Sequence, residues 1–115
     1  MTATITAQDA LKARVEDQPA LKHRDRAVLR FLASRASDGE TARAAIREIA
    51  SNTQMDPKTV RRSVAWLAEN HVVIVVNRRL TDGTALPNEY IITPDELDRL
   101  TEWEVITSDI PIPTN

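Results

Sequence analysis

The segment Gln54-Met55-Asp56-Pro57 constrains the fold of this chain more than any other. Aspartate is a preferred N-cap residue, and proline is over-represented at the first helical position because its missing N–H is not needed there. A helix therefore has to begin at Pro57. Val60, Val64 and Leu67 follow at helical spacing, which predicts an amphipathic helix over residues 57–70.

Three helices are predicted before this point. Thr6-Ala7-Gln8-Asp9 has the spacing of a hydroxyl N-cap followed by an acid, which indicates a short helix to about Asp17. Gln18-Pro19 then interrupts the chain, and an apolar stripe predicts a second helix over residues 23–37. The narrow apolar face formed by Ile46, Ile49 and Ala50 predicts a third helix over residues 41–53.

Two strands are predicted after the capped helix. The β-branched run over residues 72–76 indicates a strand, and a second short strand is expected over residues 89–93. Asp82-Gly83 favours a turn between them, so the pair forms a hairpin whose long tip covers residues 78–88. Thr93-Pro94 repeats the helix-start pattern and predicts a last helix to about Glu102, followed by a tail.

The distribution of charge along the chain is uneven. Residues 20–92 carry twelve basic and eight acidic side chains, which is a net charge of +4, whereas residues 1–19 carry −1 and residues 93–115 carry −5. The whole-chain value of −2 therefore conceals a basic middle. A local basic face matters more for contact with phosphates than the overall sum.

Composition excludes several classes of protein. The chain has no cysteine, so disulfides and thiolate metal sites are excluded. It has no long apolar run, and its first nine residues lack a signal-peptide pattern, so we expect a cytoplasmic protein without membrane contact. No glycine-rich phosphate loop and no nucleophile with a supporting base is present, so neither an enzyme nor a cofactor nor a small-molecule ligand is predicted.

The order helix, helix, turn, helix, strand, loop, strand resembles the winged helix-turn-helix family, in the small versions found in phage, plasmid and bacterial regulators and replication proteins. The resemblance covers residues 21–93. It is carried by three segments, Ile46-Arg47-Glu48-Ile49-Ala50, Met55 to Arg62 and Leu67 to Val73. It implies a mainly α fold with a small β-hairpin, a DNA-binding domain over residues 21–93, an N-terminal helical extension over residues 1–20 and an acidic C-terminal helix and tail over residues 94–115.

Two positions depart from the family pattern. In this family, glycine often occupies the turn before the helix that reads DNA. This chain has Gln54 at that position, and a left-handed backbone is less favourable for glutamine than for glycine. Glycine also often precedes the hairpin, where this chain has Asn70-His71, although asparagine tolerates the same conformation.

The helix over residues 57–70 is the predicted reader of DNA. At about 100° per residue, Val64 and Leu67 fall within about 40° of Val60 and face the core. On the opposite side, between about 100° and 200°, lie Lys58, Arg61, Arg62 and Ala65. The family resemblance implies that this side enters the major groove of double-stranded DNA. Arg61 and Arg62 are the candidates for base contact, with Thr59 and Ala65 contributing less and Lys58 contacting phosphate or base.

Further contacts are expected around this helix. Arg43 and Arg47, near the start of the preceding predicted helix, suit phosphates, and Arg78 and Arg79 at the base of the hairpin suit the minor groove or the backbone. The alternative for each of these side chains is an ordinary solvated surface charge. That alternative is favoured for Arg24, Arg26, Arg30 and Arg35. Glu48 and Asp25 are expected to pair locally with arginines, and His23 and His71 give no metal site.

Association between copies is left open by the sequence. Trp66 lies near 240° on the same wheel, beside the basic side, and is covered either within the chain or by a second subunit. Leu11 and Val15 raise the same choice, and Trp103 is the fourth candidate for an interface. A homodimer would double the DNA footprint and permit a palindromic site.

The sequence is compatible with three functions. A sequence-specific transcriptional regulator, expected to act as a repressor, comes first. A plasmid or phage replication or partition protein, with several copies along DNA, is the alternative of the same chemistry. A winged-helix module that binds another protein, without DNA, is the alternative of a different class.

Overall fold

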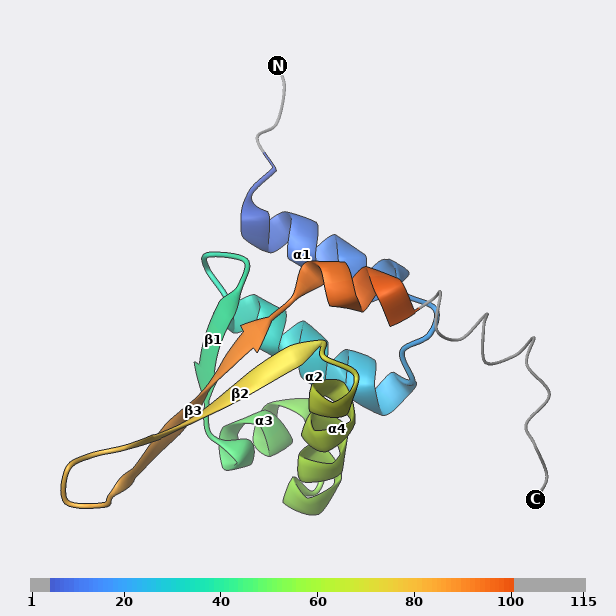
Figure 1. Ribbon diagram of the computed structural model, residues 1–115. Coiled ribbons are helices and arrows are strands. Elements are labelled where there is room, and N and C mark those ends of the chain that lie inside the picture. The colour runs from blue at the N-terminus through green and yellow to red at the C-terminus, as the bar shows by residue number, and fades with distance from the viewer. Residues whose placement is uncertain (1–4, 101–115) are drawn as a thin grey trace, which may run out of the picture.

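The computed structural model describes residues 5–100 and shows a mixed α/β fold, with helices packed against one face of a small antiparallel sheet (Figure 1). The elements are α1 (Ala7–Asp17), α2 (His23–Arg35), β1 (Thr41–Ala44), α3 (Ile46–Thr53), α4 (Pro57–Glu69), β2 (Val73–Arg79) and β3 (Ala85–Ile92). A fifth helix begins at residue 94 and is described to residue 100. The predicted end of this helix at Glu102, the tail and Trp103 lie outside the described residues.

The predicted helix starts of α1 and α4 are confirmed. The Thr6 hydroxyl accepts a hydrogen bond from the backbone N–H of Asp9 at 3.0 Å, and Asp56 Oδ1 accepts from the N–H of Lys58 at 3.0 Å. Pro57 occupies the first turn of α4. Each cap satisfies an N–H that has no partner within the helix, and this fixes where the helix begins.

The prediction of one helix over residues 41–53 is wrong in its first part. Residues 41–44 form β1, which pairs antiparallel with β3, with Thr41 opposite Ile91 and Arg43 opposite Glu89. The fold therefore has a three-stranded sheet in the order β1-β3-β2, rather than a hairpin alone. A strand of four residues has little signal of its own, and pairing with a segment 46 residues away provides the backbone hydrogen bonds that stabilise it.

The predicted hairpin is present, but its strands are longer than expected. β2 and β3 stay paired as far as Arg79 and Ala85, so the tip covers residues 80–84 and not residues 78–88. The register shifts between Val76 and Arg78, opposite the segment that contains Pro87. Such an irregularity keeps the ladder intact on both sides while it accommodates an extra residue. The hairpin projects from the body of the protein (Figure 1).

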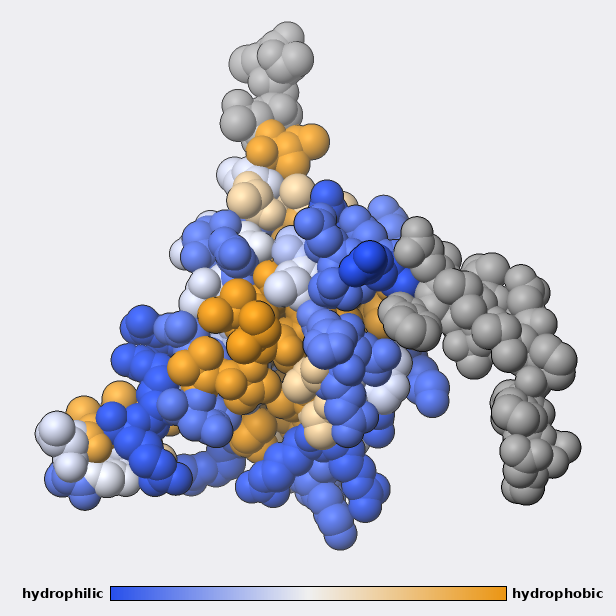
Figure 2. Space-filling model, in the orientation of Figure 1, coloured by the Kyte–Doolittle hydropathy of each residue, from blue (hydrophilic) through white to orange (hydrophobic). Residues whose placement is uncertain are grey.

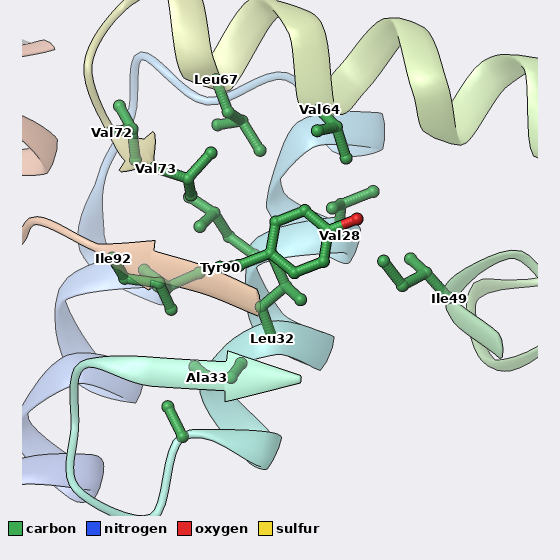
Figure 3. Close-up of a cluster of buried hydrophobic side chains, with 14 of the residues drawn as sticks. Val28, Leu32, Ala33, Ile49, Val64, Leu67, Val72, Val73, Tyr90 and Ile92 are labelled. Atoms are coloured by element: carbon green, nitrogen blue, oxygen red, sulfur yellow. The ribbon is translucent and has the colours of Figure 1, made fainter. Parts of the chain in front are cut away.

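The core lies between the sheet and the helices α2, α3 and α4 (Figure 3). Tyr90 is fully buried at its centre and points from β3 toward Val28 and Leu32 of α2. Burial raises the pKa of the Tyr90 hydroxyl, whose oxygen accepts a hydrogen bond from the Asn88 amide at 3.4 Å. The rest of this core is aliphatic, in keeping with the low aromatic content of the chain.

The segments on either side of residues 21–93 contribute to the same core. Leu11 and Val15 of α1 are 2% and 0% exposed, and Leu97 and Leu100 of the last helix are 0% and 3% exposed. All four belong to one continuous hydrophobic cluster with α2 and the sheet. Leu11 and Val15 are therefore covered within their own chain. They offer no exposed surface to a second subunit.

Two residues other than glycine adopt a left-handed backbone. Gln54 ends α3 with φ 57° and ψ 39°, as the turn position required. At the start of the hairpin it is His71, with φ 63°, and not Asn70, that takes this conformation. The turn between α3 and α4 is thus made with a residue that is less suited to it than glycine.

Candidate nucleic-acid interface

The rotation of α4 about its axis agrees with the predicted wheel. Val60, Val64 and Leu67 are buried against the core, whereas the opposite side of the helix is open. Lys58, Arg61, Arg62 and Ala65 are exposed on that side, and Thr59 is half-buried. We call the exposed set Lys58, Arg61, Arg62 and Ala65 the basic face of α4.

The cations of the basic face have no internal counter-ion. Among residues 5–100, the side chains of Lys58, Arg61 and Arg62 form neither an ion pair nor a hydrogen bond. Arg47, exposed on the first turn of α3, is likewise unpaired within this part of the chain. Hydrophilic residues gather at the end of the molecule where α4 begins (Figure 2). Unpaired cations beside a helix N-terminus can donate hydrogen bonds to phosphate oxygens or to acceptor atoms on base edges.

A buried polar contact holds α4 against α2. The Ser63 hydroxyl, on the core side of α4, donates a hydrogen bond to Asp25 Oδ1 at 2.7 Å, and both residues are 0% exposed. The same oxygen accepts from Nε of Arg24 at 3.1 Å, which confirms the expected local pairing of Asp25 with an arginine. Because Ser63 follows Arg62 directly, this hydrogen bond restricts how the basic face can rotate. Sequence reasoning missed it, since nothing local marks Ser63 as the partner of a residue 38 positions earlier.

Arg43 does not lie where it was expected. It is on β1 rather than near the start of a helix, and its Nε forms an ion pair with Glu89 Oε2 of β3 at 3.1 Å. The side chain is still 63% exposed. A phosphate contact by Arg43 would have to compete with this cross-strand partner.

The hairpin carries the last two candidates. Arg79 is exposed, and its Nη1 donates to the carbonyl oxygen of Gly83 at 3.1 Å across the tip, whereas Arg78 is half-buried and has no partner among the described residues. Hydrogen bonds from the Thr84 side chain and backbone N–H lower the pKa of Asp82, so the tip also holds a stable negative charge. The structure therefore places the cations of the hairpin at its outer half, away from the basic face of α4.

Trp66, a candidate for an interface, is half-buried and packs against the core of its own chain.

Across residues 5–100, no group of three histidine, cysteine or acidic side chains is arranged to hold a metal ion. None of the helices in this range combines the length and the apolar character needed to cross a membrane.

Comparison with known proteins gives a likeness of fold. The sequence matches no protein-family model and no curated protein. The structure is similar to a solved structure described as a possible transcriptional regulator from Methanosarcina mazei Go1, with a TM-score of 0.54 and 16% sequence identity over 88% of this chain and 81% of that chain. The protein thus has a mixed α/β fold that is compatible with the winged-helix class.

Proposed function

We propose that this protein binds double-stranded DNA in a sequence-specific manner and acts as a transcriptional regulator, in the form of a repressor. The observation that carries the proposal is the basic face of α4: three exposed cations, on a helix with a fixed start, that have no anionic partner in the described chain. The similar fold of a possible transcriptional regulator supports the same role. The role requires no catalysis and no cofactor.

The residue types on this face suit the major groove. An arginine can form two parallel hydrogen bonds to O6 and N7 of guanine, and we assign this role to Arg61 and Arg62. Ala65, exposed on the same side, permits close approach to the base pairs and can contact a thymine methyl group. Lys58 and Thr59 lie in the first turn of α4, which comes closest to the groove when a helix enters it by its N-terminal end.

Positions around α4 would hold the phosphate backbone. Arg47, exposed at the start of α3, is the stronger candidate, because Arg43 is already paired with Glu89. Arg78 and Arg79 would contact the backbone or a narrow minor groove, since the hairpin extends beyond the body of the protein (Figure 1). These contacts set the register of the protein on DNA and carry little sequence information.

The test is selection of binding sites from a random duplex library, followed by binding measurements at several salt concentrations. We expect one recovered sequence pattern and an affinity whose logarithm falls with the logarithm of salt by about 0.9 per phosphate contact. A protein that recovers no pattern and whose affinity for duplex DNA does not depend on salt does not read DNA, and the module that binds another protein then becomes the better explanation.

The length of the protected DNA separates a repressor from a replication or partition protein. A repressor with one or two copies protects a short site, whereas copies aligned along repeated origin sites protect a long, periodic one. We propose the first.

A further inference from the structure

The outer face of the sheet, turned away from the core, is apolar. Ile74 of β2 lies directly opposite Ile91 of β3, and Val76 follows two residues along β2 on the same side. Ile74 is 51% exposed, Val76 is 36% exposed and Ile91 is half-buried. We call these three residues the outer sheet patch. Hydrophobic residues gather over the front of the sheet in Figure 2, where no described helix covers them.

Such a patch is unusual for an antiparallel sheet with one buried face. The inner residues Val73, Tyr90 and Ile92 already bury their side chains in the core, and the opposite face of such a sheet is ordinarily polar. Within the described residues only four large hydrophobic side chains are exposed, and two of them, Ile74 and Val76, belong to this patch. Contiguous exposed apolar side chains rimmed by polar ones mark sites of protein association.

We propose that the outer sheet patch is the surface through which two copies of this chain associate, face to face about a two-fold axis. An isologous interface requires one patch to be complementary to itself. The polar neighbours of the patch satisfy this requirement, because Arg43 and Glu89 lie beside each other next to Val76 on the same face. A two-fold axis that passes beside this pair would bring Arg43 of one copy toward Glu89 of the other.

The direction in which the patch faces agrees with binding of both copies to one duplex, a step that rests on the proposed function. In Figure 1 the sheet faces the viewer, while α4 runs up the picture with its N-terminal end at the bottom. Two copies joined through the front about a two-fold axis parallel to α4 would present both α4 helices on the same side.

The small area of the patch determines how strong the association is. Stable interfaces bury roughly 1,200–2,000 Å² in total, and three aliphatic side chains per copy provide only part of that. The copies are therefore expected to be monomeric in dilute solution and to pair when DNA raises their effective concentration.

Cysteine cross-linking tests the patch without any assumption about DNA. Since the chain has no cysteine, the variants Ile74→Cys and Val76→Cys each carry one thiol. Under mild oxidation at increasing protein concentration we expect disulfide-linked dimers of both, formed much faster than those of Leu80→Cys, a control whose side chain is 49% exposed at the hairpin tip. Equal rates for the three variants overturn the proposal. So does protection of the Ile74→Cys thiol from a small alkylating reagent in the monomer, because the chain itself would then cover the face.

Cooperative binding tests the same patch on DNA. With duplexes that carry one or two selected sites, the native protein is expected to bind the second site about tenfold more tightly than the first. Ile74→Thr, which keeps a β-branched side chain in the strand, is expected to abolish this cooperativity and to leave the single-site affinity and the melting temperature unchanged. Cooperativity that survives in Ile74→Thr overturns the proposal, whereas failure of the native protein to bind even one site refutes the proposed function and leaves the cross-linking result standing.

Discussion

Helices α2 and α4 have the same length of 13 residues and both carry several cations, yet they use them in opposite ways. Arg30 of α2 pairs through both Nε and Nη2 with Glu16 of α1, at 2.8 and 2.7 Å, and Arg35 pairs with Glu48 of α3 at 2.5 Å. Arg24 pairs with Asp25, and Arg26 donates to the Gln18 carbonyl oxygen. The cations of α4 have no such partner in the described chain.

The difference comes from what surrounds each helix. α2 lies between α1 and α3, which each turn an acid toward it, and the Arg30 guanidinium lowers the pKa of the Glu16 carboxyl through its hydrogen bonds. Among residues 5–100, α4 meets its neighbours through its apolar side and Ser63. The ion-paired cations of α2 are thus neutralised within the chain, whereas those of α4 have no anionic partner among residues 5–100.

The largest effect on DNA binding is expected when α4 is given an acid of its own. Ala65→Glu places a carboxylate one turn from Arg61 on the exposed side, where it can pair with Arg61 and repel phosphate. We expect DNA affinity to fall by about 100-fold or more, since a like charge facing DNA costs several kcal/mol. Fluorescence anisotropy with a labelled selected duplex measures the effect. Ala65→Gln, of the same size but neutral, is the control, and an equal loss in both variants would point to a steric cause.

Removal of single cations separates base contacts from phosphate contacts. Arg61→Ala or Arg62→Ala is expected to cost about 1–3 kcal/mol of binding and to relax the preference at one base position. Arg47→Ala is expected to weaken binding to all sequences alike and to reduce the salt slope by about 1. Arg30→Ala, in the paired set of α2, should leave binding unchanged. Site selection repeated with each variant provides the measurement, and a uniform loss for Arg61 and Arg62 removes them from base readout.

The contact that joins the two helices can be broken separately. Ser63→Ala leaves Asp25 without its hydroxyl donor in a fully buried position, which is expected to lower the free energy of unfolding by about 1–3 kcal/mol. Urea denaturation measures this. Ser34→Ala on the exposed side of α2 is the matched control, with an expected change within about 0.5 kcal/mol. If Ser63→Ala is as stable as the control, the hydrogen bond does not hold α4 in place.

The smallest expected effect concerns the turn that leads into α4. Gln54 adopts a left-handed backbone without the freedom of glycine, so Gln54→Gly is expected to raise the free energy of unfolding by a few tenths of a kcal/mol, up to about 1. Thermal unfolding followed by circular dichroism reports the shift. Gly83→Ala is the opposite control, because Gly83 has φ +90° and open space around it, and it should be destabilised by backbone strain alone.

Local chemistry was enough to predict several elements. The caps at Thr6 and Asp56 determined where α1 and α4 begin, because a side chain that bonds a free N–H acts within three residues of its own position. The helical period then predicted which side of α4 is exposed. Strand β1 was not predicted because its four residues have no distinct strand pattern, and they form a strand by pairing with β3.

Local sequence was therefore enough to predict the starts of α1 and α4, the turn before α4 and the cationic composition of its open side, since these depend on short-range hydrogen bonding and periodicity. Packing of the folded chain sets which cations are neutralised, which strand completes the sheet and which apolar residues stay uncovered. Those outcomes depend on segments 13 to 46 residues apart that meet only in the folded chain, as Arg35 meets Glu48 and Arg43 meets Glu89. No local pattern encodes such a meeting, because it is the packing of the whole core that brings the partners together.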